Sequence, residues 1–136
     1  MMPELKTRRL FISHAWTYCT HYNTLVKWFN EEPNFSWINY SVPSDDGCTE
    51  KTKSGLKTCL TNQMRPAQGI IVLAGMYAAH SDWIDYEIDE AIRMGKTIIG
   101  VRPWGQERMP VKIQNAAHTI VSWNSASIIS AVREWI

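Results

Sequence analysis

The stretch GIIVLAGMYAAHSDWIDYEIDEAIRMGKTIIGV, residues 69–101, contains two short apolar runs with a helical pattern between them. The runs GIIVLA (69–74) and TIIGV (97–101) are apolar almost throughout, which is typical of parallel strands covered on both faces. Between them, apolar residues recur at helical spacing: Ile84, Ile88, Ala91 and Ile92. The stretch therefore predicts a strand, a helix and a second strand in succession.

The same alternation of strand and helix patterns extends in both directions. Arg9–Ser13 (RLFIS) is another continuous apolar run and is expected to be an inner strand. Ser36–Val42 (SWINYSV) and His118–Trp123 (HTIVSW) are more polar, as edge strands are. Five such units over residues 1–136 predict a single α/β domain. Its fold is expected to be flavodoxin-like, with three layers and a five-stranded parallel sheet in the order 2-1-3-4-5.

Helix boundaries are also readable in the sequence. Pro33 and Pro66 each follow a helical pattern and mark probable helix ends, while Pro110 can open a short helix. Gly95 is expected to cap the helix that precedes the fourth strand. Either Asn124 or Ser125 is expected to be the N-cap of the last helix.

The composition excludes several classes of protein. The 136 residues are 45% hydrophobic, and 14 Lys and Arg balance 13 Asp and Glu, so no general electrostatic attraction to nucleic acid is indicated. No apolar run reaches the ~18 residues that span a bilayer, so no membrane association is expected. The three cysteines are odd in number and form no CxxC pair, which argues against a disulfide framework and a structural zinc site. These features predict a cytoplasmic protein.

Three loops are the expected ligand site, because open parallel sheets bind ligands beyond the carboxyl ends of their strands, at the switch between strands one and three. The loops are Ser13–Tyr18, Pro43–Glu50 and Gly75–Trp83. The four histidines show no ligand spacing, so no metal site is expected. GKT at 95–97 lacks the preceding glycine of a phosphate-binding loop and comes before a strand instead of after one.

Glu87 is a carboxylate on the side of a helix that should be packed. It lies one turn from Trp83 and about 60° from Ile84 around the helix axis, at ~100° per residue. A lone, partly desolvated carboxylate suits cleavage of a glycosidic bond through an oxocarbenium-like transition state. A glutamate in such a pattern can also be a partly exposed rim residue or the partner of an Arg or Lys. The residues around it have structural alternatives too: packing for the tryptophans, capping for Ser13 and His14, and turn formation for Asp45 and Asp46.

Three segments together resemble the TIR domain, in particular the bacterial TIR-like proteins of Thoeris antiphage defence. They are RLFISHAW (9–16), the polar loop after the second strand, and SDWIDYEIDEAIRMGKTIIGV (81–101). In enzymatic TIR domains a WxxxE pattern holds the catalytic glutamate, and here it is Trp83 to Glu87. The resemblance implies that Glu87 is catalytic and that two loops and Trp83 line an NAD site. The loop residues are Phe11, Ser13, His14, Ala15 and Trp16 after strand one, and Ser44, Asp45 and Asp46 after strand two.

The function implied by this resemblance is that of an NAD glycohydrolase or ADP-ribosyl cyclase. NAD would be the substrate, with no cofactor and no metal, and the product would be nicotinamide and an ADP-ribose-derived signal nucleotide, for which a cyclic form is expected. In a bacterial cytoplasm, a phage-derived trigger would start the reaction, a separate effector protein would respond to the nucleotide, and the chain would form a homo-oligomer.

Two other functions stay open from the sequence. A non-catalytic TIR adaptor would use the same fold only to recruit other TIR domains, and Glu87 would then be a rim or interface residue. A nucleoside deoxyribosyltransferase-like enzyme has a similar sheet and a glutamate nucleophile, and it would turn over free nucleosides instead of NAD.

Overall fold

The computed structural model describes residues 6–13, 20–40, 53–74, 77–102 and 109–136. Its strands are β1 (Thr7–Ser13), β2 (Ser36–Asn39), β3 (Gly69–Leu73), β4 (Thr97–Val101) and β5 (Thr119–Val121). Its helices are α1 (Thr20–Glu31), α2 (Lys53–Met64), α3 (Tyr77–Arg93), α4 (Val111–Ala116) and α5 (Ser125–Trp135). Strands and helices alternate along the described chain, as the sequence predicts.

The five strands form one parallel sheet in the order β2-β1-β3-β4-β5. Leu10 of β1 pairs with Gly69 of β3, and Gly69 pairs in turn with Thr97 of β4. The predicted flavodoxin-like order is therefore confirmed, with β2 and β5 at the edges. In this order the chain switches direction across the sheet between β1 and β3, and the carboxyl ends of these two strands lie side by side.

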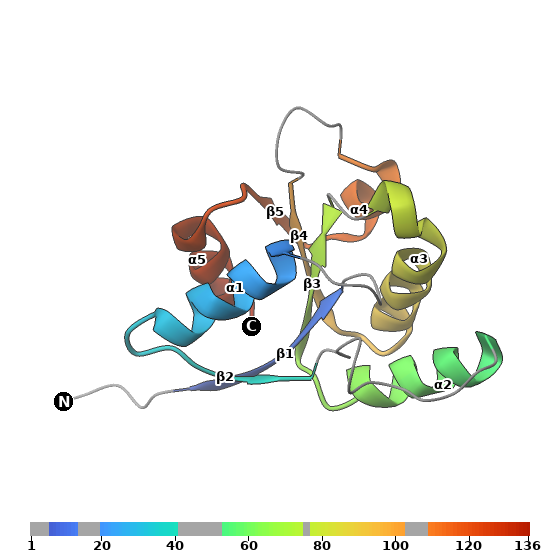
Figure 1. The fold of residues 1–136 in the computed structure, drawn as a ribbon, viewed down its shortest axis with the longest axis horizontal. Helices are drawn as coiled ribbons and strands as arrows, with labels where there is room; N and C mark the ends of the chain where they lie inside the picture. The colour runs from blue at the N-terminus through green and yellow to red at the C-terminus, as the bar shows by residue number, and fades with distance from the viewer. Residues whose placement is uncertain (1–5, 14–19, 41–52, 75–76, 103–108) are drawn as a thin grey trace.

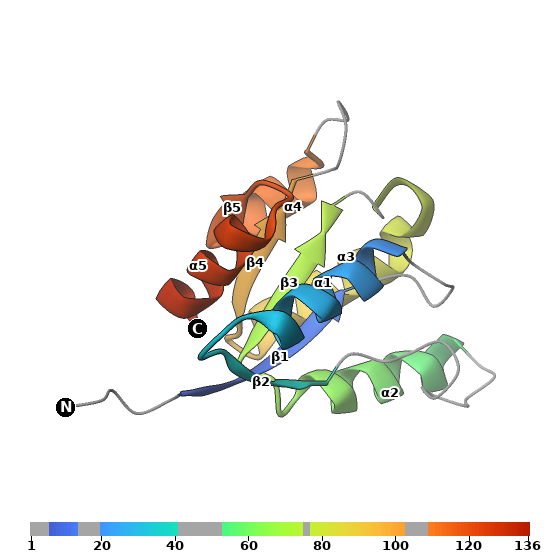
Figure 2. The same cartoon turned by 60° about the vertical axis from the view of Figure 1, so that its left-hand side comes forward.

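Helices cover both faces of the sheet, which gives three layers (Figures 1 and 2). Helices α1 and α5 lie on one face, while α2, α3 and α4 lie on the other. Each face has its own apolar core, because alternate residues of a strand point to opposite sides. On β1, Leu10 and Ile12 face α1 and α5, whereas Phe11 faces α2, α3 and α4.

Helix termini follow the predicted capping residues. The side chain of Asn124 accepts a hydrogen bond of 2.8 Å from the backbone N–H of Ser127 and caps α5. Gly95 has φ +69°, the left-handed conformation that ends α3 without the strain a side chain would cause. Helix α4 starts directly after Pro110.

Two expectations for α3 are wrong. The helix begins at Tyr77, so it takes up most of the predicted loop Gly75–Trp83 and places Glu87 about three turns from its start. Ile92 was expected in the core but is 56% exposed. At ~100° per residue, Ile92 lies about 80° from Ile84 on one side and Glu87 about 60° on the other. The buried face of α3 is turned toward Glu87, which leaves Ile92 outside it.

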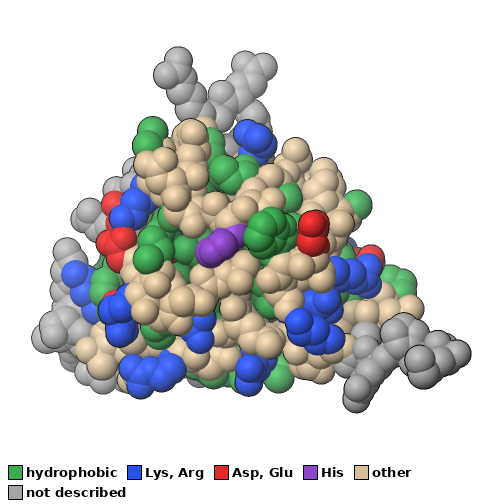
Figure 3. Space-filling view, turned by 180° about the vertical axis from the view of Figure 1, so that it is seen from behind, with side chains coloured by type: hydrophobic (Ala, Val, Ile, Leu, Met, Phe, Trp, Pro, Cys, Tyr) green, Lys and Arg blue, Asp and Glu red, His purple; other side chains and the backbone are tan. Residues whose placement is uncertain are grey.

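Cys59 of α2 is disulfide-bonded, although the odd number of cysteines and the lack of a CxxC pair argue against a disulfide framework. No helix within the described ranges combines the length and the apolar character that crossing a membrane requires. Figure 3 shows one face of the molecule, on which Lys and Arg side chains lie mainly in the lower part and are separated from one another by other surface.

Candidate active site at Glu87

Glu87 is on α3 and is buried on the side of this helix that packs against the sheet. Its exposed fraction is 1%, and its neighbours Ile84, Ile88 and Ala91 on the same helix are fully buried. Ser13, the last residue of β1, is also fully buried. Because side chains alternate along a strand, Ser13 points to the same face as Phe11, which is the face that packs against α3. A helix and the carboxyl end of an inner strand thus bring these two polar groups together.

The two groups are short of hydrogen bonds. The Ser13 hydroxyl lies beside the Glu87 carboxyl, yet among the described residues neither Ser13 Oγ nor Glu87 Oε2 has a partner of good hydrogen-bond geometry. A buried polar atom without a partner costs stability, on the order of 1–3 kcal/mol. Such atoms are uncommon in folded proteins and often mark a site where a ligand or water completes the bonding.

Burial raises the pKa of Glu87 to about 8. The main cause is the loss of solvation, which penalises the charged carboxylate, and the nearby Ser13 hydroxyl opposes the shift only in part. The carboxyl group is therefore mainly protonated at neutral pH in the ligand-free protein. A strongly shifted acid at the carboxyl edge of a parallel sheet is a candidate for catalysis.

Glu87 fits neither of its structural alternatives, which are a rim residue and a partner of Arg or Lys. It is not a rim residue, and no described Lys or Arg forms a salt bridge with it. Two other carboxylates of α3 behave differently. Asp89 pairs with Lys112 at 2.5 Å on the surface, and Glu90 pairs with Arg93 at 2.6 Å. Glu87 alone among these three is withdrawn from both solvent and cations.

Polar contacts between α2 and α3 flank the site, and sequence reasoning missed them. Thr61 Oγ1 lies 2.6 Å from the hydroxyl of Tyr86 and donates a hydrogen bond of 2.9 Å to Glu90. The Tyr86 hydroxyl also donates to the backbone oxygen of Lys57 at 3.0 Å. Tyr86 and Glu90 are four residues apart and so share one side of the helix, which is the signal that could have indicated them.

The structure gathers four of the predicted site residues and does not describe the others. Phe11, Ser13, Trp83 and Glu87 all lie at or against the face between the sheet and α3. The remaining six fall outside the described residues: His14, Ala15, Trp16, Ser44, Asp45 and Asp46. Within the described ranges, no three His, Cys, Asp or Glu side chains are grouped as metal ligands would be.

Comparison with protein families gives a match to the model of the Thoeris protein ThsB, TIR-like domain, over residues 11–108. The chain belongs to this family. No curated protein matches the chain. The ThsB match covers the end of β1 and all of β2, β3 and β4, and it includes Ser13 and Glu87, while α4, β5 and α5 lie beyond it. Family membership also confirms the TIR resemblance and connects the chain with Thoeris antiphage defence.

Proposed function

We propose that this ThsB-family domain cleaves NAD, with Glu87 as the catalytic carboxylate. The observation that carries the proposal is the buried Glu87 side chain, whose Oε2 atom lacks a hydrogen bond beside an equally unsatisfied Ser13. These groups lie at the end of β1, next to the switch point where sheets of this order bind ligands. Family membership supports the choice of NAD as substrate.

The proposed reaction breaks the bond between the ribose and the nicotinamide nitrogen. The bonding electron pair moves to the positively charged nicotinamide ring, which leaves neutral, so no acid is needed to protonate it. The ribose becomes oxocarbenium-like, and an ionised Glu87 stabilises that charge. Water, or a nucleophilic atom of the adenine, then attacks the ribose, and a proton is released.

Substrate binding would itself ionise the glutamate. The protonated carboxyl of the empty site meets a positively charged nicotinamide ribosyl group, and a nearby cation favours the carboxylate form. Binding of NAD should therefore release a proton from Glu87 to solvent. Ser13 would donate its hydroxyl to the carboxylate or to a ribose hydroxyl, which would satisfy both atoms that lack partners.

Burial of Glu87 would limit the access of NAD to it and so control the activity. NAD reaches a side chain that is 1% exposed only when the packing around it opens. A lone chain should therefore turn over slowly, and a phage-derived trigger or homo-oligomerisation would open the site. The nicotinamide-free product, in its expected cyclic form, would then carry the signal to a separate effector protein.

The experiment compares nicotinamide release from NAD by the parent chain and by Glu87→Gln, with and without lysate of infected cells. The substitution keeps the shape and removes the ionisable group, and we expect a loss of about 100-fold or more, as for the removal of one transition-state contact. Chromatography measures nicotinamide, and mass spectrometry identifies the nucleotide product.

Asp89→Asn is the matched control, because Asp89 lies on the same helix but pairs with Lys112 on the surface. This variant should release nicotinamide at the parent rate. The proposal is wrong if the parent consumes no NAD under either condition, or if Glu87→Gln is as active as the parent. Turnover of free nucleosides but not of NAD would favour the transferase alternative.

A further inference from the structure

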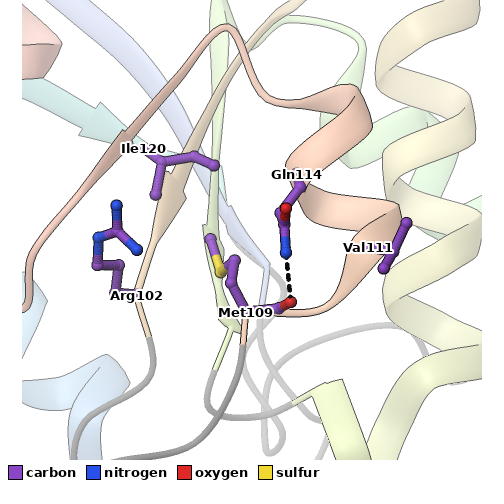
Figure 4. Close-up of a pocket in the computed structure, with 5 residues that line it drawn as sticks. All are labelled: Arg102, Met109, Val111, Gln114 and Ile120. Atoms are coloured by element: carbon purple, nitrogen blue, oxygen red, sulfur yellow. Dashed lines mark hydrogen bonds between the residues drawn. The ribbon is translucent and has the colours of Figure 1, made fainter.

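A pocket lies between β5 and α4, at the edge of the sheet opposite to β2. Its volume is about 450 Å³, within the range of small-molecule sites. Figure 4 shows Arg102 and Ile120 on the strand side, Gln114 and Val111 on α4, and Met109 between them. Strands β3 and β4 separate β5 from β1, so this pocket is distinct from the Glu87 site.

The sheet itself shapes the pocket. Gly100 of β4 pairs with Ile120 of β5 on the side that α4 covers. A side chain at Gly100 would bring its Cβ to 3.2 Å from the Met109 methyl group and 3.0 Å from Ile113, so the glycine lets Met109 lie against the strand. The backbone N–H of Arg102 donates to Val121 O at 2.8 Å, which extends the ladder and holds Arg102 at the end of β4.

Two polar groups of the pocket have free bonding capacity. No described residue forms a hydrogen bond or ion pair with the Arg102 guanidinium. The Gln114 amide donates from Nε2 to Met109 O at 2.7 Å. Since a carbonyl oxygen only accepts, this bond fixes the orientation of the amide and leaves Gln114 Oε1 as an acceptor for another partner.

We propose that this pocket binds a small ligand that has a planar body, an oxyanion and an N–H donor. Arg102 would bind the oxyanion through its guanidinium fork, and Gln114 Oε1 would accept from the ligand N–H. The planar body would pack on the apolar side chains of Met109 and Ile120, and a thioether packs well against an aromatic ring. This inference concerns a separate site and does not rest on NAD cleavage.

Two ligand classes share this chemistry. In a nucleotide the oxyanion is a phosphate and the donor is an exocyclic amine, as in adenosine monophosphate. In an aromatic amino acid analogue the oxyanion is a carboxylate, as in 4-aminobenzoate. The test uses both compounds as probes, with adenosine and benzoate as partners that each lack one of the two groups.

The full chain is labelled with carbon-13 at the methionine methyl groups and titrated with each probe by NMR. We expect the Met109 signal, assigned with Met109→Leu, to shift with at least one of the two oxyanions. Adenosine, which has no oxyanion, should bind about 10-fold more weakly than its monophosphate, and benzoate, which has no amine, more weakly than 4-aminobenzoate. The preferred probe identifies the oxyanion as phosphate or carboxylate.

Four variants locate the binding. Arg102→Gln should weaken the preferred oxyanion about 10-fold or more, whereas Arg9→Gln, an exposed arginine on β1, should not. Gln114→Leu should abolish the preference for the amine. Glu87→Gln should bind the probe as the parent does, which separates this pocket from the NAD site. The proposal is overturned if neither oxyanion shifts Met109, or if Arg102→Gln binds as tightly as the parent.

Discussion

Burial gives the carboxyl group of Glu87 a behaviour opposite to that of Glu90, one turn further along α3. Hydrogen bonding to Arg93, together with Thr61 and nearby positive charges, lowers the pKa of Glu90 despite its partial burial. Desolvation instead raises the pKa of Glu87 to about 8. Two glutamates three residues apart thus differ in charge at neutral pH, because Glu87 is fully desolvated whereas Glu90 is hydrogen-bonded to Arg93.

This difference predicts a pH-dependent effect of Glu87→Gln on stability. The pKa of Glu87 is near 4.5 in the unfolded chain and about 8 in the folded protein, so folding takes up a proton between these values. The parent therefore loses stability as the pH rises through this window, by up to about 1.4 kcal/mol per pH unit. The glutamine variant cannot ionise. Its free energy of unfolding should therefore increase relative to that of the parent as the pH rises from about 5 to about 8, as measured by urea unfolding.

Glu90→Gln is the control for this measurement. The pKa of Glu90 is lowered, so the group is ionised in both the folded and the unfolded chain above about pH 6, and its effect on stability should not change from there to pH 8. If the free energy of unfolding of Glu87→Gln differs from that of the parent by the same amount at every pH, Glu87 ionises normally in the folded protein.

Sequence patterns located Glu87 but could not describe its surroundings. The helical period placed a carboxylate on the packed side, and the WxxxE resemblance suggested its role. Neither could show that Ser13 would lie beside it without a hydrogen bond, because that depends on how α3 packs across the end of β1. The contacts of Thr61 with Tyr86 and Glu90 were missed for the same reason, since they join two helices.

At the scale of the elements, apolar strands were predictable and helix starts were less so. Thr97–Val101 was predicted with its observed limits, because a buried parallel strand is apolar on both faces. The start of α3 at Tyr77 was missed, because no capping motif or proline marks it in the sequence. The rotation of that helix was also misjudged, as the exposure of Ile92 shows.

The rotation of α3 predicts different effects for two isoleucines one turn apart. Ile88→Ala removes a fully buried side chain from the core between the sheet and α3, and it should lower the free energy of unfolding by about 2–5 kcal/mol. Ile92→Ala acts at a side chain that is 56% exposed, and it should change stability by less than about 1 kcal/mol. Chemical unfolding of both variants measures the difference, and equal losses would contradict the observed rotation.

At the scale of the whole molecule, side-chain hydrogen bonds connect the first strand with the last helix. The Arg8 side chain of β1 donates to Val132 O at 3.3 Å and to Arg133 O at 3.2 Å, near the end of α5. Lys6 also donates to the backbone oxygen of Ile136. Val132 O also accepts from the backbone N–H of Ile136. The Arg133 and Ile136 oxygens follow it at the end of the helix, where carbonyl groups lack partners within the helix, so Arg8 and Lys6 satisfy them and complement the helix dipole. Contacts across this sequence distance could not be read from local patterns.

Arg8→Met should therefore destabilise the whole fold and not only its amino-terminal strand. Arg8 is 9% exposed, and its loss leaves the Arg133 oxygen without that donor, which should cost about 1–3 kcal/mol. Arg9→Met is the matched control, because the neighbouring side chain points to solvent and should change stability by less than about 0.5 kcal/mol. If β1 and α5 unfold together with the sheet, urea transitions followed by tryptophan fluorescence and by circular dichroism will coincide and shift equally in Arg8→Met. Separate transitions, or a loss in Arg9→Met as large as in Arg8→Met, would contradict this role.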